Sequence, residues 1–342
     1  MSFFCFWSTS LRVCVTLVAP NFFGWVVSRV MYSCLPASNI SHVGCSQLPW
    51  GRAVVDALYP GPSAPSRPVM INVGANKGYA ALDFLQAWGG CVPTPSSWAK
   101  VYEEYAELVD SGFLRWAACG MCGECRARVQ PARSRHASPV VHALELMPET
   151  RAALRYAINK TGTEALITVW SLAASNASAT VRLPPRRRYI GSEWASLPMT
   201  PVPNTAASDE YVDVTTIDAF LRTIDVDAVQ HLMIDVEGHD ALVLEGARET
   251  LQAKRVEVVS FEYSGHGYWN ARAADRRTLR ETQRWLLELD YHCFLIGRRT
   301  LFPISGECWN SSLERRRWSN VACASSPRAV RALGALARAQ GA

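Results

Sequence analysis

The sequence predicts an α/β fold organised around a mostly parallel, doubly wound sheet. Short apolar runs recur along residues 69–296, and most of them precede a stretch with apolar residues at helical spacing. A glycine-containing turn, residues 74–78, joins the first run to its helix. Amide and carboxyl side chains stand where several runs end, which is the edge where doubly wound sheets bind ligands.

The composition fits one large globular domain or two modest ones. The chain has 342 residues, of which 49% are hydrophobic and 19% charged, and these values exclude wholesale disorder. Part of the net charge of +5 comes from arginine runs at residues 186–188 and 315–317. We expect no nucleic-acid partner, because such proteins usually carry a broader basic face with interleaved aromatic residues.

The first predicted unit is a strand at residues 69–73, the turn at 74–78 and a helix at 79–88. Such a turn lets a ligand approach the backbone, and the helix N-terminus offers free N–H groups to an anion. The turn lacks the full G-x-G-x-x-G spacing of dinucleotide sites, which favours another adenosine cofactor over NAD. The alternative is an ordinary tight connection between a strand and a helix.

The second and third units supply further candidates for a nucleoside site. A strand at residues 140–145 ends in Glu145, which is placed to accept hydrogen bonds from two ribose hydroxyls. Its alternative role is that of an acid at the N-terminus of the next helix, residues 148–158. A strand at residues 166–170 leads to small residues, including Ser171 and Ala173, that leave room for an adenine ring.

The later units repeat the same order. Residues 178–183 read as an additional β segment and 217–224 as a helix, with Thr215 or Thr216 as its N-cap. Strands are predicted at 231–236, 256–261 and 291–296, and helices at 241–251 and 278–289. The strand ends bring together one amide and four acids: Asn72, Glu145, Asp235, Glu237 and Glu262. Buried acids are costly unless they are paired or serve a ligand, so this convergence predicts a functional site.

Two of these segments resemble the FkbM-type methyltransferases. Residues 71–78 are similar to the first motif of that family, and residues 234–240 with 244–247 are similar to its most distinctive signature. Residues 215–218 also fit, so that the resemblance covers about residues 69–90 and 140–300. It implies a Rossmann-like class I methyltransferase fold, S-adenosyl-L-methionine as the methyl donor, and O-methylation, often of a sugar hydroxyl.

The resemblance also assigns roles to individual residues. It implies that Asn72, Gly74, Asn76 and Gly78 bind the methionine part and that Glu145 binds the ribose. The small residues Ser171 and Ala173, which leave room for the adenine, complete the expected cofactor-binding set. The family usually has aspartate where this chain has Asn72. An amide can still hydrogen-bond the amino group of the donor, but without charge assistance, so weaker binding or lost activity is expected.

A hydroxyl acceptor needs a base to remove its proton. Asp235 is the first candidate for this catalytic role, followed by His239 and His266, and His239 could equally be a structural residue at a helix start. No metal is assigned to the site, although Asp235 and Glu237 together could hold a divalent cation. The expected partner is a small-molecule, glycan or lipid hydroxyl acceptor. The alternatives are a non-catalytic binding module with this fold and a nucleotide-dependent oxidoreductase.

The N-terminus predicts a targeting segment. Residues 3–30 are almost entirely apolar or small, which suggests a signal anchor, a cleaved signal peptide or an imperfect targeting sequence or start. We therefore divide the chain into the segment 1–30, a linker at 31–68 rich in Pro, Gly and Ser, the methyltransferase domain 69–326 with an insertion at 90–139, and an Ala/Arg-rich tail at 327–342. The tail is expected to be a frayed helix or disordered.

The expected location is a membrane-anchored domain in the lumen of the secretory pathway, with the cytoplasm as the alternative. Eleven cysteines agree with the lumen, as do four N-x-S/T sequons at Asn39, Asn159, Asn176 and Asn310.

The insertion carries a helix-like stretch at residues 98–116, followed by three closely spaced cysteines, Cys119, Cys122 and Cys125, that permit three interpretations. They could bind zinc with Cys91 or His136 as the fourth ligand, form disulfides, or be incidental. The insertion itself is expected to cap the cofactor site or to shape acceptor specificity. Cys308 and Cys323 are a further candidate disulfide.

Overall fold

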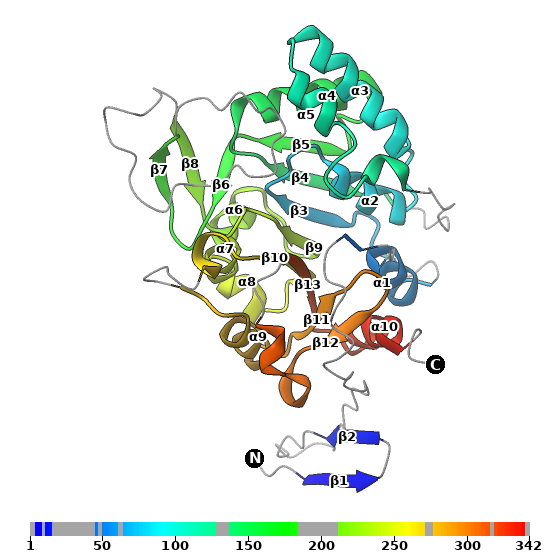
Figure 1. Cartoon of the computed structure of the whole chain (residues 1–342), viewed down its shortest axis with the longest axis vertical. Helices are drawn as coiled ribbons and strands as arrows, with labels where there is room; N and C mark the ends of the chain where they lie inside the picture. The colour runs from blue at the N-terminus through cyan, green and yellow to red at the C-terminus, as the bar shows by residue number, and fades with distance from the viewer. Residues whose placement is uncertain are drawn as a thin grey trace.

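The computed structural model describes residues 4–8, 11–15, 45–46, 50–60, 64–127, 137–183, 211–270, 276–314 and 318–338. Its centre is a sheet of eight strands in the order β12-β11-β13-β10-β9-β3-β4-β5 (Figure 1). Their bounds are Val69–Val73 (β3), Val140–Leu144 (β4), Ile167–Trp170 (β5), Val229–Ile234 (β9), Val256–Tyr263 (β10), His292–Ile296 (β11), Leu301–Pro303 (β12) and Ser319–Ala324 (β13). Neighbours from β5 to β10 are parallel, whereas β13 runs antiparallel to both β10 and β11.

Helices cover both faces of the sheet, which confirms the doubly wound α/β prediction (Figure 1). One face packs against α1 (Trp50–Leu58), α2 (Tyr79–Ala87), α3 (Pro95–Leu108), α5 (Pro148–Thr161) and α10 (Pro327–Arg338). The other packs against α6 (Ile217–Thr223), α7 (Asp240–Glu245), α8 (Arg248–Gln252) and α9 (Leu279–Glu288). A small sheet, β6-β8-β7, stands beside β5 and consists of Leu172–Ala174 (β6), Ala179–Arg182 (β7) and Tyr211–Thr215 (β8).

Two predicted helices are each divided in the structure. The helix predicted at residues 241–251 is α7 followed by α8, because the carboxylate of Asp218 accepts hydrogen bonds from the backbone N–H groups of Glu249 and Thr250 and caps a new helix start. The helical stretch of the insertion is likewise α3 followed by α4 (Gly112–Ala117). It breaks at Asp110, whose φ is +49°, and restarts where the Ser111 hydroxyl caps the N–H of Leu114.

The folded unit extends beyond the expected domain limits of residues 69 and 326. Helix α1 lies in the segment expected to be a linker, and α10 lies in the tail expected to be frayed or disordered. Both bury apolar residues, among them Val54, Leu58, Val330 and Leu333, in one cluster with residues of β10, β11 and β13. Packing of these residues against the sheet stabilises the two helices. The proline-rich and arginine-rich composition of the flanking sequence hides this packing.

Only two short parts of the apolar N-terminal segment are among the described residues. They are β1 (Phe4–Ser8) and β2 (Leu11–Val15), which pair antiparallel. The rest of residues 1–30, on which the anchor and signal-peptide interpretations depend, lies outside the described residues. Within the part of the chain that is described, no helix has the length and apolar character needed to cross a membrane.

The cysteines settle one question that the sequence left open and correct one candidate pairing. Cys119 pairs with Cys125 and Cys122 with Cys45, so the disulfide interpretation of the three insertion cysteines is confirmed and the zinc and incidental interpretations are wrong. Of its proposed fourth ligands, Cys91 is an exposed free thiol and His136 lies outside the described residues.

The expected Cys308–Cys323 pairing is also wrong, because Cys323 is bonded to Cys293. These two residues face each other in the register of β11 and β13, a strand pairing that the sequence did not reveal. Cys308 is disulfide-bonded as well, to a different cysteine.

The disulfides lead to a stability prediction. Cys45→Ser with Cys122→Ser opens a bridge with a sequence separation of 77, and Cys119→Ser with Cys125→Ser opens one with a separation of 6. The gain in unfolded-chain entropy should cost about 4.5 kcal/mol of unfolding free energy for the first pair and about 2 kcal/mol for the second. Denaturant unfolding measures both, with Cys91→Ser as the neutral control. Equal losses of unfolding free energy for the two double variants would contradict the assignment of these two disulfides.

Candidate functional site

A cavity of about 420 Å³ opens at the carboxyl ends of β3, β4, β9 and β10. Its walls include the turn after β3, Glu145 after β4, Asp235 after β9 and Glu262 within β10. This is the edge at which the sequence placed the site. Of the predicted site residues, the structure brings seven together around this cavity: Asn72, Gly74, Asn76, Gly78, Glu145, Asp235 and His266.

The turn after β3 is held tightly against its neighbours. Gly74 has a φ of +78°, and a Cβ there would lie 1.9 Å from the carbonyl oxygen of Asp235, so only glycine fits. The N–H groups of Gly74 and Ala75 both donate to the Leu144 carbonyl, at 3.0 Å. The turn therefore connects the ends of β3, β4 and β9.

The insertion fixes the other side of the same turn. The Trp98 indole N–H and the Tyr102 hydroxyl, one helical turn apart on α3, donate to the Lys77 carbonyl at 2.7 and 2.9 Å. Both side chains are fully buried. Sequence reasoning missed this role, although the four-residue spacing of two aromatics in a predicted helix was a visible signal that they share a face.

Glu145 is buried and fixed in orientation by backbone donors. Its Oε2 accepts a hydrogen bond from the Asn76 N–H and its Oε1 accepts one from the Met147 N–H, both at 2.8 Å. Burial raises the pKa of the carboxyl, and these two hydrogen bonds oppose that rise. Each oxygen keeps a second lone pair, so Glu145 can accept two further hydrogen bonds from a ligand in the cavity.

Asn72 is 1% exposed, and its side-chain nitrogen has no hydrogen-bond partner within the described residues. A buried amide donor without a partner costs about 1–3 kcal/mol. Because Asn72 lines the cavity, a ligand with an acceptor atom at this position would remove that cost.

Acidic side chains gather on the wall formed by β9 and β10. Asp235, Glu237 and Glu262 line the cavity, and Asp240 is buried behind them. Asp240 accepts hydrogen bonds from the N–H groups of Gly238 and Glu262, at 3.1 and 3.2 Å. Burial, and next the negative charge of Asp235, raise the pKa of both Asp240 and Glu262. In the empty cavity these two acids therefore favour their protonated, uncharged forms, and a positive charge in the cavity would favour their ionised forms.

Three predicted site residues lie away from the main cavity. His239 and Ala173 line a separate small pocket behind Gly74 and Val236. The His239 ring packs edge-on against Tyr268 with 5.1 Å between centroids, and burial lowers its pKa to about 4. Ser171 is exposed and lines neither pocket. Asp235 and His266 are therefore the predicted bases that reach the cavity.

The cavity also has walls that the sequence did not predict individually. Met121, Cys122 and Glu124 from the insertion line it, as does Trp318 just before β13. The insertion thus reaches the site, as expected for a cap. Met121 and Trp318 are partly exposed apolar side chains at this position, which suits contact with an incoming molecule.

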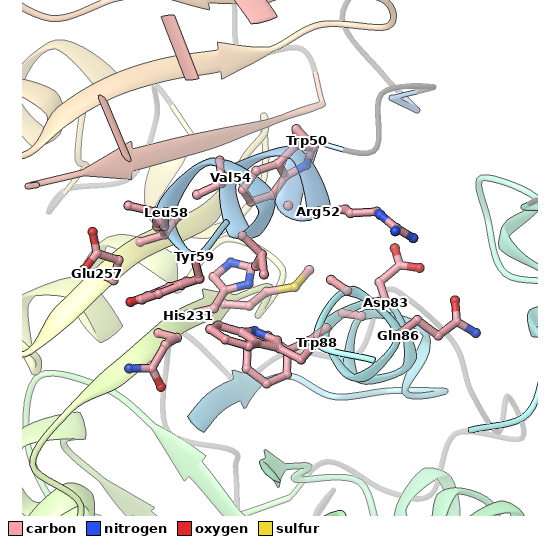
Figure 2. Close-up of a pocket in the computed structure, with 18 residues that line it drawn as sticks. Trp50, Arg52, Val54, Leu58, Tyr59, Asp83, Gln86, Trp88, His231 and Glu257 are labelled. Carbon is pink, nitrogen blue, oxygen red and sulfur yellow. The ribbon is translucent and has the colours of Figure 1, made fainter. Parts of the chain in front are cut away.

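A second cavity, of about 250 Å³, lies between α1, α2 and the strands β9 and β10 (Figure 2). Met233 and Ala80 line both cavities, so the two adjoin. Figure 2 shows His231 among the aromatic side chains of the second cavity. The His231 Nε2 lies 2.8 Å from the Ser260 hydroxyl, and burial lowers the pKa of the ring to about 4.

Most residues of this site lie within a segment that matches a known family. The family model described as "Methyltransferase FkbM domain" matches residues 72–293, which contain the turn, Glu145 and the acidic wall. No curated protein matches the chain at a significant level.

Three solved structures are similar over most of the chain. The crystal structure of methyltransferase FkbM from Methylobacillus flagellatus KT has 12% identity and a TM-score of 0.38, and the match covers 79% of this chain and 47% of that one, about half of its length. The METTL16 MTase domain has 10% identity and a TM-score of 0.34, with 81% and 66% covered. Human methyltransferase 10 domain containing protein has 10% identity and a TM-score of 0.32, with 81% and 80% covered. With TM-scores this low, the family assignment rests on the family model.

The half-buried His231 predicts a pH dependence of stability. Its folded pKa of about 4 lies below its ordinary value of 6.5, so the unfolded chain binds the proton first as pH falls. The stabilisation is present above about pH 6.5 and is lost toward pH 4, which amounts to about 2 kcal/mol between pH 7 and pH 5. Denaturant unfolding at both pH values should show this loss reduced in His231→Gln, which keeps a polar partner for Ser260. If His231→Gln lost as much unfolding free energy between pH 7 and pH 5 as the unaltered protein, the prediction would be contradicted.

Proposed function

Because the chain belongs to the FkbM methyltransferase family, we propose that it transfers the methyl group of S-adenosyl-L-methionine to a hydroxyl oxygen of a small-molecule, glycan or lipid acceptor. The observation that carries the proposal is the link between Glu145 and the glycine turn. The Glu145 carboxylate accepts the Asn76 N–H, so the acid suited to ribose hydroxyls and the turn suited to the methionine part form one preorganised surface.

In this proposal, different residues of the chain bind different parts of the cofactor. Glu145 offers its remaining lone pairs to the two ribose hydroxyls. The amide of Asn72 donates to the carboxylate of the methionine part and accepts from its ammonium group, which gives its buried nitrogen a partner. An aspartate at this position would add charge to the second of these contacts, so Asn72 is expected to weaken donor binding.

The reaction is an in-line displacement at the methyl carbon. The acceptor oxygen forms a bond to the methyl group as the bond from that carbon to the sulfonium sulfur breaks, and the acceptor proton passes to a base. We assign this base to Asp235, which follows β9 and lines the cavity beside the turn. The donor is already activated, so the remaining work of the protein is to align the two reactants.

Two variants with opposite signatures test the proposal. Glu145→Ala should remove donor binding measured by calorimetric titration, because the ribose hydroxyls lose their acceptor. Asp235→Asn should keep donor binding and lose most methyl transfer in a screen with labelled donor across glycan, lipid and small-molecule pools. General-base catalysis is commonly worth about 10²–10⁴ in rate.

Three outcomes of this test would contradict parts of the proposal. Well-folded protein that binds no donor would overturn the cofactor assignment. Donor binding without transfer to any pool would favour a non-catalytic binding module. Binding of NAD(P) in place of the donor would favour an oxidoreductase.

We further propose that the domain resides in the secretory-pathway lumen. The disulfides Cys45–Cys122, Cys119–Cys125 and Cys293–Cys323 support an oxidising compartment. The sequons at Asn159, Asn176 and Asn310 are exposed, as glycan attachment requires.

The lumenal location predicts glycosylation in cells. Treatment of the expressed protein with an amide-cleaving glycosidase should increase its gel mobility, and Asn159→Gln should remove one step of the shift. Asn270→Gln, which alters an exposed asparagine outside any sequon, serves as the control. An unshifted protein whose cysteines are all alkylated without prior reduction would instead place the domain in the cytoplasm.

A further inference from the structure

We propose that Asp235, Glu237 and Glu262 form a binding site for a hard divalent cation of the Mg²⁺ or Mn²⁺ class. One carboxylate oxygen from each residue lies within 4.8 Å of the other two. Oxygens around one octahedral ion, at about 2.1 Å from it, are separated by about 3 Å when adjacent and about 4.2 Å when opposite. The three oxygens are therefore close enough to contact a single ion after small side-chain adjustments.

Glu262 supplies an independent observation. Its side chain is 1% exposed, and its Oε2 makes no hydrogen bond to any described residue. The nearby backbone donors of Gly238 and of Glu262 itself are already used by Asp240. A carboxylate oxygen without water or a donor is costly in a protein interior, and a cation in the cavity would give it a partner.

The backbone places all three side chains at one position. β9 and β10 are parallel with Ile234 beside Phe261, so Asp235, which follows β9, lies beside Glu262 of β10. Glu237 has a φ of +54°, which is uncommon for a non-glycine residue. The turn that carries it is held by the hydrogen bond from the Tyr268 N–H to the Gly238 carbonyl, at 2.9 Å.

The donor set determines the chemistry of the ion. Three carboxylates without nitrogen or sulfur ligands favour Mg²⁺, Mn²⁺ or Ca²⁺ over zinc. Asp235 and Glu237 are half-buried on the cavity side, so the remaining coordination positions face the space where the acceptor would lie. An acceptor with two neighbouring oxygens, such as a vicinal diol of a sugar, fits two of these positions.

This role in acceptor binding rests on the proposed methyl transfer. A cation-bound hydroxyl loses its proton more easily, because the ion stabilises the oxygen anion. Asp235 would bind the ion through one oxygen and could receive the acceptor proton on the other. The cation would thereby select acceptors with paired oxygens and assist the base in the same step.

Metal binding can be measured without any acceptor. Full-length protein treated with a chelator should bind one Mn²⁺ per chain, as detected by loss of the free-ion electron paramagnetic resonance signal. Glu262→Gln and Glu237→Gln should each weaken binding at least about tenfold. Glu124→Gln removes an acid from the same cavity outside the cluster and should leave Mn²⁺ affinity unchanged. Mn²⁺ should raise the Tm of the unaltered protein and of Glu124→Gln, but not that of Glu262→Gln.

Titration of S-adenosyl-L-methionine into each variant separates this inference from the proposed function. Donor binding without stoichiometric Mn²⁺ at millimolar concentration, or equal Mn²⁺ affinity in all variants, overturns the cation site and leaves the methyltransferase proposal intact. Mn²⁺ binding that depends on Glu262 in a protein that binds no donor supports the site and overturns the function. A Glu262→Gln apoprotein at least as stable as the original would show that this carboxylate serves a ligand and not the fold.

Discussion

The site depends on the close approach between the turn after β3 and the end of β9. At Gly74 the backbone lies so near the Asp235 carbonyl that no side chain can be accommodated. This contact sets the separation between the surface that would bind the donor and the acids that would act on the acceptor. The N–H of Asn76, in the same turn, donates to Glu145. The five residues of the turn, 74–78, therefore couple the positions of the ends of β3, β4 and β9.

The second requirement is that the turn be supported from outside the sheet. Trp98 and Tyr102 hold its Lys77 carbonyl, and their helix leads through α4 to the disulfide-bonded segment that lines the cavity. Cys45–Cys122 ties that segment to a residue before α1. Parts of the chain that contribute no strand thus fix both the floor and the rim of the site, which suits a reaction whose barrier is lowered mainly by alignment.

The sequence predicted what local patterns encode. Apolar periodicity located the strands that carry Asn72, Glu145 and Asp235, and parallel order placed their carboxyl ends together. The sequence could not predict that β13 lies between β10 and β11, because long-range strand pairing leaves no local pattern. The position of β13 between these two strands places Cys323 opposite Cys293 and Trp318 beside the cavity. His239 lines a separate small pocket for a related reason: proximity in sequence to Asp235 does not fix side-chain direction at the start of a helix.

Charge along the cavity places a final constraint on the chemistry. The positive charge of a sulfonium donor disappears during methyl transfer, so a strongly negative wall beside it would stabilise the bound donor more than the transition state. Asp235, Glu237 and Glu262 would form such a wall if all three were ionised, and a divalent cation among them would offset most of its charge. At the methionine end, Asn72 in place of an acid also reduces the attraction. Both features would lower the affinity for the donor ground state, and the cation would do so while favouring loss of the acceptor proton.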